Sequence, residues 1–148
     1  MKYIEATNTY EPLYGERSIY LAGGITGTPD WQREIVRLLD RNNLVIFNPR
    51  RKSFPIDDTD AAKEQIKWEY KYLRISDEIV FWFPSESLCP IALYELGAWC
   101  MIKKPIYLGV HPEYQRRIDI EIQTHLVRPD IKIVYSISDL IRLIVESQ

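Results

Sequence analysis

The sequence predicts an α/β protein built on a doubly wound, flavodoxin-like sheet of five parallel strands with helices on both faces. Two observations lead to this fold class. Short apolar runs typical of buried strands alternate with longer segments whose apolar residues recur at helical spacing. Glycines follow the first run and a proline stops the second, as expected where strands end in tight turns. With 148 residues the chain is long enough for one domain with a real core, so residues 1–148 are assigned to a single domain.

The first three elements are a strand, a helix and a strand. The run "SIYLAGG" (18–24) is expected to be a buried strand that ends in a glycine turn. The helix expected over residues 28–43 has Thr28 as its N-cap and Pro29 in its first turn. "LVIFNP" (44–49) is expected to be the second strand.

The middle of the chain continues the alternation. Residues 56–76 are mostly helix, with aspartates near the start, where the helix dipole favours negative charge. "EIVFWF" (78–83) is expected to be the third strand, "PIALYELGAWCMI" (90–102) a helix and "PIYLGV" (105–110) the fourth strand.

The two ends of the chain are less regular. "IKIVYS" (131–136) is expected to be the fifth strand and residues 136–147 a closing helix. Residues 112–130 are compatible with a helix or with irregular structure. Residues 1–17 precede the repeating unit and form either an extra strand or an arm onto another subunit.

The strand order 2-1-3-4-5 fits this alternation and predicts where a ligand binds. In such sheets ligands lie beyond the carboxyl ends of the strands, near the point where the strand order reverses. The loops after the first three strands should therefore surround one crevice.

Composition excludes several classes of function. The net charge of −2 gives no basic surface for a nucleic-acid polymer. No apolar run reaches the roughly 18 residues of a membrane span, and the N-terminus lacks the apolar core of a secretory signal. We therefore expect a soluble, cytoplasmic protein without membrane partners. The two cysteines do not form a disulfide framework, and His111 and His125 lack metal-ligand spacing, so no metal is assigned.

Three side chains are the strongest candidates for chemistry. Glu95 lies in the apolar run "IALYELGAWC" with no lysine or arginine one helical turn away, so it faces either water or a pocket. Glu69 replaces an apolar residue on the stripe formed with Ala62, Ile66 and Leu73, or else reaches out from the stripe edge. Tyr20, in the first strand, is either a core ring or a hydroxyl beside a carboxylate.

Polar groups in the three loops are candidates for substrate binding. Gly23 and Gly24 precede a helix N-terminus, which suits a polar or anionic ligand or simply makes a tight turn. Asn48 and Arg50 follow the second strand. Ser85 and Ser87 follow the third, where hydroxyls could bind a sugar or a phosphate or only face solvent.

Two carboxylates that converge on one crevice are typical of enzymes that break glycosidic bonds. One attacks the anomeric carbon to form a covalent sugar ester, and the other protonates the leaving group.

The segments "IYLAGGITG", "WEYKYLRISDEIVFWFP" and "LYELGAW" resemble the nucleoside 2-deoxyribosyltransferase family over roughly residues 18–110. The resemblance implies that Glu95 is the nucleophile, that Glu69 handles the base and that Tyr20 positions the nucleophile. Family members usually have aspartate at the position of Glu69. Their sugar-binding acid corresponds to Cys89, and related monophosphate hydrolases have a phosphate-binding serine there, so this loop matches neither pattern.

The function expected from these observations is transfer of 2-deoxyribose between nucleobases, with no cofactor. Trp31 and the aromatic residues of "VFWFP" are candidates for base stacking. The partners are small nucleosides and nucleobases, and the resemblance implies a homo-oligomer in which a neighbour's segment, around residues 111–123, completes the site. The alternatives are a nucleoside or 5′-monophosphate N-glycosidase and a nucleotide-binding sensor without chemistry, which the presence of two carboxylates disfavours.

Overall fold

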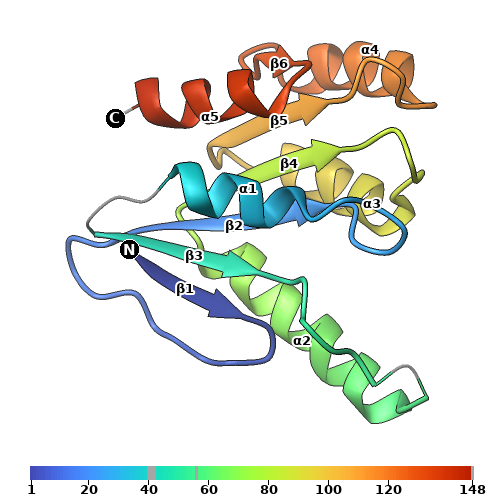
Figure 1. The fold of residues 1–148 in the computed structure, drawn as a ribbon. Helices are drawn as coiled ribbons and strands as arrows, with labels where there is room; N and C mark the ends of the chain where they lie inside the picture. The colour runs from blue at the N-terminus through green and yellow to red at the C-terminus, as the bar shows by residue number, and fades with distance from the viewer. Residues whose placement is uncertain (40–42, 56, 148) are drawn as a thin grey trace.

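The computed structural model describes residues 1–39, 43–55 and 57–147, which form a parallel sheet with helices on both faces (Figure 1). The sheet has six strands in the order β1-β3-β2-β4-β5-β6. They are β1 (Lys2–Glu5), β2 (Arg17–Gly23), β3 (Leu44–Asn48), β4 (Glu78–Phe83), β5 (Ile106–Val110) and β6 (Ile133–Val134). The five predicted strands occupy the predicted order, and the α/β class is confirmed.

The predicted count of five strands is wrong because the N-terminal segment supplies a sixth. β1 pairs in parallel with β3, with Lys2 opposite Val45 and Glu5 opposite Asn48. The chain then returns across α2, where the Trp68 indole donates a hydrogen bond to the Asn8 carbonyl at 2.6 Å and the Tyr10 amide donates one to the Tyr72 hydroxyl at 2.9 Å. The first residues therefore extend the chain's own sheet.

Five helices complete the fold: α1 (Trp31–Leu38), α2 (Thr59–Ile75), α3 (Pro90–Cys100), α4 (Arg117–Val127) and α5 (Ile137–Glu146). Side chains of α2, α3 and α4 join the core on one face of the sheet, and those of α1 and α5 join the core on the other face. Residues 117–127 of the ambiguous stretch are thus helical. No helix in the described ranges has the length and apolar character needed to cross a bilayer.

The start of α1 differs from the expected one, whereas α2 begins within its expected range. α1 begins at Trp31 with Asp30 as its N-cap, because the Asp30 carboxylate accepts a hydrogen bond from the Arg33 amide at 3.1 Å, so the predicted Thr28 cap is wrong. Part of the predicted C-terminal end of that helix, residues 40–42, lies outside the described residues. α2 begins after Asp58, whose side chain accepts from the amides of Asp60 and Ala61.

The buried stripe of α2 is rotated by one residue from the predicted one. The side chains that face the sheet are Ala61, Gln65, Trp68, Tyr72 and Leu73, whereas Ile66 is 64% exposed. Aromatic rings of this stripe pack on the strands: Tyr72 stacks on Phe47 with ring centroids 4.2 Å apart, and Trp68 lies tilted beside Tyr20 with centroids 6.2 Å apart. Glu69 therefore lies at the edge of the buried stripe, a position from which its carboxyl can reach a pocket.

The alternation of β2 decides which of its side chains reach that pocket. Ile19 and Leu21 join the core under α1 and α5, whereas Tyr20 and Ala22 join the core under α2 and α3. This is the period-two rule of a strand buried on both faces. Tyr20 thus lies on the same side of the sheet as Glu69 and Glu95.

Candidate active site

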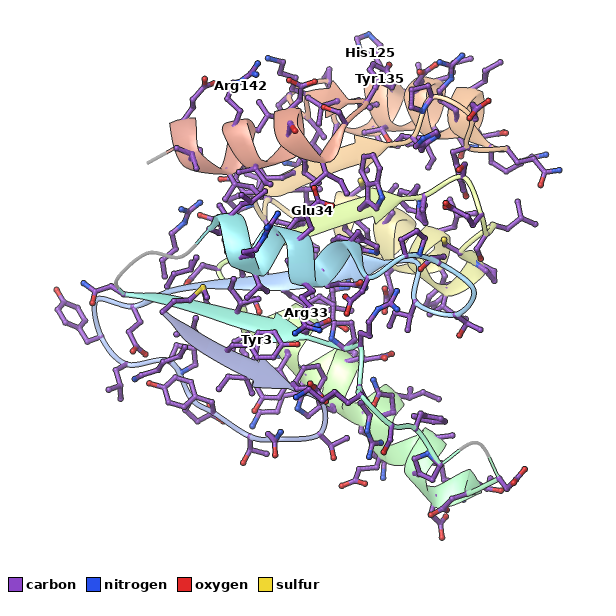
Figure 2. The ribbon with its side chains drawn as sticks, in the orientation of Figure 1. Tyr3, Arg33, Glu34, His125, Tyr135 and Arg142 are labelled. Carbon is purple, nitrogen blue, oxygen red and sulfur yellow. The ribbon has the colours of Figure 1, made fainter. Side chains whose placement is uncertain are left out.

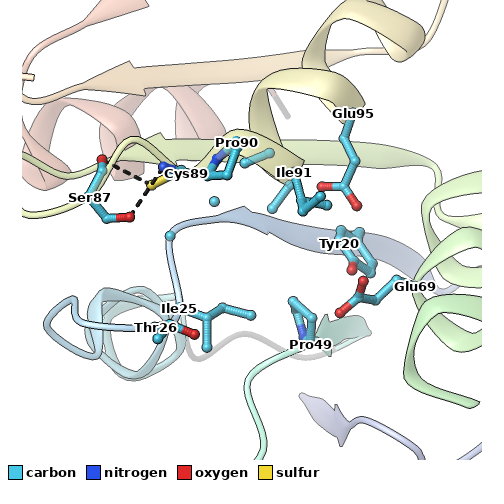
Figure 3. A pocket seen from close by; sticks show the side chains of 14 residues that line it. Tyr20, Ile25, Thr26, Pro49, Glu69, Ser87, Cys89, Pro90, Ile91 and Glu95 are labelled. Carbon is cyan, nitrogen blue, oxygen red and sulfur yellow. Dashed lines mark hydrogen bonds between the residues drawn. The ribbon is translucent and has the colours of Figure 1, made fainter. Parts of the chain in front are cut away.

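A pocket of about 370 Å³ opens at the carboxyl ends of β2 and β3, between α2 and the start of α3 (Figure 3). Its walls come from the end of β2 and the following loop, from Pro49 after β3, from Glu69 on α2, and from residues 87–95. This is the crevice expected where the strand order reverses, because β3 and β4 lie on opposite sides of β2.

The pocket brings together the three side chains singled out as catalytic candidates. Glu69 from α2 and Glu95 from α3 both line it, and Tyr20 from β2 lies between them at its base (Figure 3). Both carboxyl groups point into the same space. The two helices that carry them cover the same face of the sheet. Glu69 and Glu95 are 26 residues apart in the sequence, yet both lie beside Tyr20.

The environment of Glu95 disfavours its charged form. Burial in the pocket wall raises the pKa of Glu95 from 4.5 to about 8, and the nearby carboxyl of Glu69 adds to the rise. Its neighbours on α3 include the exposed Ile91 and the buried Ala92, neither of which compensates a negative charge. Near neutral pH this environment therefore favours the protonated form of Glu95.

Glu69 shares this tendency but has one opposing contact. Burial raises the pKa of Glu69, while the side-chain amide of Gln65 donates a hydrogen bond to its Oε1 at 2.8 Å and favours the carboxylate. The same amide nitrogen donates to the Pro49 carbonyl at 2.8 Å. Gln65 thus ties the acid on α2 to the pocket wall after β3.

Tyr20 remains a neutral phenol. Burial raises the pKa of Tyr20 well above its ordinary value, and the carboxyls of Glu69 and Glu95 both add to the rise. Its residue exposure is 1%. A phenol beside two carboxyls can donate a hydrogen bond to whichever of them is ionised.

The start of α3 closes one end of the pocket. Cys89 occupies the N-cap position in a left-handed conformation with φ 48°, and Pro90 is the first helical residue. The Cys89 amide donates to the Ser87 hydroxyl at 3.2 Å, and the Cys89 thiol contacts the Ser87 carbonyl at 3.4 Å. Ser87 and Cys89 both line the pocket, and Cys89 does not cap the helix with a side-chain hydrogen bond. The first-turn amides of α3 therefore have no side-chain cap.

Gly23 and Gly24 line the pocket as expected, and both positions require glycine. A Cβ atom at Gly23, which has φ +146°, would lie 2.2 Å from the Trp82 carbonyl oxygen. A Cβ atom at Gly24 would lie 2.7 Å from the Cys89 sulfur and 2.9 Å from Pro84. The β2 end and the α3 start can pack this closely only without side chains.

Trp31 does not line the pocket. It is buried under α1 on the opposite face of the sheet, and its indole donates to the Gly24 carbonyl at 2.8 Å, so it supports the loop from behind. Trp82 lies on that same face, and Phe83 is fully buried. Ser85 also lies outside the lining. Tyr20 is the aromatic residue of the lining, so the predicted stacking role of Trp31 has no geometric support.

Asn48 and Arg50 likewise lie outside the pocket, against a second hollow of about 260 Å³. Tyr3 and Arg33, labelled in Figure 2, also line this hollow. The Asn48 amide donates to the Tyr3 hydroxyl at 2.8 Å. Arg50 holds the back of the loop that follows β2: its Nη2 lies 2.9–3.5 Å from five oxygen atoms of residues 24–29. Its Nε donates to Gln32 at 2.9 Å. Arg50 therefore shapes the pocket wall from outside.

Sequence reasoning missed Gln65 and the pocket-lining Pro49 and Ile91. Gln65 precedes Glu69 by one helical turn, and a buried amide one turn from a candidate acid was a usable signal. Nothing in the local pattern of Pro49 or Ile91 distinguishes a pocket wall from an ordinary loop or helix residue. Within residues 1–39, 43–55 and 57–147, no cluster of His, Cys, Asp and Glu side chains is arranged to hold a metal ion.

Comparison with solved structures identifies a similar fold. A crystal structure titled as a conserved protein from Enterococcus faecalis V583 superposes with a TM-score of 0.61 over 90% of this chain and 99% of its own, at 15% sequence identity. At that identity the likeness concerns the fold. No curated protein sequence matches the chain significantly.

A family model, described as nucleoside 2-deoxyribosyltransferase like, matches residues 16–114. That range runs from the start of β2 to the loop after β5, and it contains every residue that lines the pocket. The matched range covers well over half of the chain and includes Tyr20, Glu69 and Glu95. The chain therefore belongs to the nucleoside 2-deoxyribosyltransferase-like family.

Proposed function

We propose that the protein transfers 2-deoxyribose between nucleobases through a covalent sugar ester on Glu95. The family supports a role in glycosyl transfer or N-glycosidic bond cleavage. The observation that supports transfer through an ester on Glu95 is the meeting of two half-buried carboxyls with the Tyr20 hydroxyl in one pocket. Each of these acids influences the ionisation of Tyr20.

The first half of the reaction breaks the bond between the sugar and the base. The Glu95 carboxylate attacks the anomeric carbon, C1′, while the C1′–N bond breaks and the bonding pair leaves with the base. Glu69 gives its proton to the departing base and becomes a carboxylate. The products are a free base and a deoxyribosyl ester of Glu95.

The second half reverses these roles with a different base. The Glu69 carboxylate removes a proton from the incoming base, whose nitrogen attacks C1′ and releases Glu95 as a carboxylate. The configuration at C1′ is retained because two inversions occur. Water in place of the second base would give free deoxyribose, which is the hydrolytic alternative.

The pair of carboxyls needs one proton to start. The active form has Glu95 ionised and Glu69 protonated, whereas burial of Glu95 favours a proton on Glu95. In a coupled pair the proton moves between the two sites, and the pKa values belong to the pair. Positive charge developing on the sugar favours an ionised Glu95, and a Tyr20 hydroxyl turned toward that carboxylate would stabilise it.

The lining favours an uncharged deoxynucleoside over its 5′-monophosphate. Among the described residues that form the pocket none is lysine or arginine, and Arg50 is engaged behind the loop. Ser87 and the first-turn amides of α3 are the remaining groups that could receive a phosphate. We therefore propose free deoxynucleosides as the preferred donors.

Incubation with a deoxynucleoside and a foreign base tests the proposal. A new deoxynucleoside, detected by chromatography, supports transfer. Free deoxyribose as the sole product would mean that the protein is a hydrolase and not a transferase. Tight binding without either product would mean that it is a nucleotide-binding sensor. The Glu95→Gln variant should give no new deoxynucleoside. Its matched control is Glu86→Gln, because Glu86 is an exposed acid on the neighbouring loop and does not line the pocket.

We also propose a homo-oligomer formed through the outer faces of α3 and α4. Six large apolar residues on this surface are 55–78% exposed: Ile91, Tyr94, Met101, Ile118, Ile122 and Leu126. At roughly 200 Å² for each residue of this size when fully exposed, they present about 800 Å², one partner's share of a standard interface. Ile91 belongs both to this surface and to the pocket lining, so a neighbouring subunit would cover the pocket rim.

A further inference from the structure

Gln65 is a buried polar side chain with a specific arrangement of partners. It lies one turn before Glu69 on the inner side of α2 and is 9% exposed. Its Nε2 donates to the Pro49 carbonyl and to Glu69 Oε1, both at 2.8 Å. Its Oε1 is buried without a partner among the described residues.

The two acceptors fix the orientation of this amide. Only the nitrogen can donate to the Pro49 carbonyl, so a flipped amide would place two oxygens against each other. Each of the two hydrogens of Nε2 has one acceptor, and the unpaired Oε1 is the cost of this arrangement. The amide therefore links the Pro49 carbonyl to the Glu69 carboxyl in one defined orientation.

We infer that Gln65 is a positioning residue that directs the acid proton of Glu69 into the pocket. The inference deepens the proposed function, on which it rests, by assigning how the general acid is oriented.

The chemistry follows from which oxygen can be protonated. In a protonated carboxyl group the carbonyl oxygen accepts a hydrogen bond better than the hydroxyl oxygen does, so the bond from Gln65 to Oε1 favours a Glu69 that carries its hydrogen on Oε2. Pro49 and Glu69 both line the pocket (Figure 3). The bridge through Gln65 holds the Glu69 carboxyl at this wall. When Glu69 gives its proton to the departing base, negative charge develops on the carboxylate, and the bond from Gln65 strengthens.

The groups that face Glu69 come from three elements. Gln65 approaches from α2 itself, the Tyr20 hydroxyl from β2 and the Glu95 carboxyl from α3. Gln65 is the one for which a hydrogen bond to Glu69 is formed in the described structure. Burial already raises the pKa of Glu69, and loss of the Gln65 amide should raise it further, because the contact that favours the carboxylate is removed.

Gln65→Leu tests this inference, because leucine removes the donor and retains similar bulk. The control is Glu64→Gln, an exposed change one residue earlier on the same helix. We expect the lower limb of the pH–rate profile to move to higher pH, turnover to fall by about tenfold or more, and KM to change little. Glu64→Gln should match the wild type in all three.

A second measurement is independent of activity. Carboxyl carbon NMR of the ligand-free protein, with the Glu69 signal assigned from Glu69→Gln, should show Glu69 titrating at higher pH in Gln65→Leu. An unmoved Glu69 titration in a folded variant would overturn the inference, even with reduced turnover, because that loss would be structural. If the wild type neither transfers nor hydrolyses while the titration moves, the proposed function fails and the assignment of Gln65 to Glu69 stands.

Discussion

Replacement of Glu95 by glutamine should abolish base exchange and at the same time stabilise the fold. The change keeps the size and shape of the side chain but removes the carboxylate that forms the sugar ester. Losing a nucleophile of this kind typically lowers turnover by several orders of magnitude. Binding of a deoxynucleoside should survive in part, because the pocket walls are unchanged.

The size of the stabilisation follows from the pKa of Glu95. The unfolded chain ionises this group near 4.5, whereas the folded chain holds the proton up to about 8. Folding therefore becomes less favourable as pH rises between these values, and at about 1.4 kcal/mol per pKa unit the upper bound of the penalty is about 5 kcal/mol. Water that reaches the pocket reduces this to about 2 kcal/mol.

Glutamine has no such penalty, so the difference in Tm should grow from pH 4.5 to pH 8. For a chain of this length, about 2 kcal/mol corresponds to roughly 4–8 °C. Thermal unfolding of both proteins across this pH range, beside chromatographic exchange assays, provides the measurement. Exchange activity retained by Glu95→Gln would contradict the assignment of Glu95 as the nucleophile. A deoxyribosyl adduct mapped by mass spectrometry to a peptide without Glu95 would do so too. A Tm difference that is the same at pH 4.5 and pH 8 would contradict the raised pKa of Glu95.

Three further predictions concern other parts of the molecule. The pH dependence of kcat/KM should be bell-shaped, with an upper limb near 8, where the carboxyl pair loses its last proton; a rate still rising above pH 9 would contradict the pairing of Glu69 with Glu95. Arg50→Ala should raise KM and speed amide hydrogen exchange at residues 24–29, because five oxygens lose their shared donor. Arg50→Lys should restore part of both properties. Unchanged hydrogen exchange in Arg50→Ala would mean that Arg50 does not hold this loop. Tyr94→Glu should lower the mass measured by light scattering, since it places a charge on the apolar α3–α4 surface, whereas Glu64→Gln should not; a wild-type monomer would remove the proposed interface.

The limits of the sequence are clearest at Trp31 and Arg50. Both follow a strand end near the predicted crevice, and both residue types suit a nucleotide ligand, so proximity in sequence favoured a binding role. In the structure both support the loop after β2 from its far side, through bonds to backbone carbonyls. Whether a side chain faces a loop or the space beyond it depends on the path of the loop backbone, which local pattern does not specify.

Glu69 shows the opposite situation: the predicted apolar stripe of α2 was partly wrong, yet Glu69, which it singled out, lines the pocket. The stripe of Ala62, Ile66, Glu69 and Leu73 is not the buried one, because Trp68 and Tyr72 bury more apolar area when they face the sheet. Helical spacing alone could not choose between two stripes one residue apart. The resemblance of the segment "WEYKYLRISDEIVFWFP" to the family pointed to Glu69 independently of that face.

The alternation of strands and helices could be read from the sequence, because the period of apolar residues is a local property of the chain. Residue type and the resemblance to the family singled out the two acids and the tyrosine, whereas the strand order 2-1-3-4-5 only fitted the alternation and depends on pairing between distant strands. Tertiary structure alone decided that residues 2–5 add a sixth strand, that the pocket is lined by aliphatic residues more than by rings, and that Gln65 joins Glu69 to Pro49. The physical reason is that these features depend on pairing and packing between segments distant in sequence, whose free energy appears only when the segments are brought together.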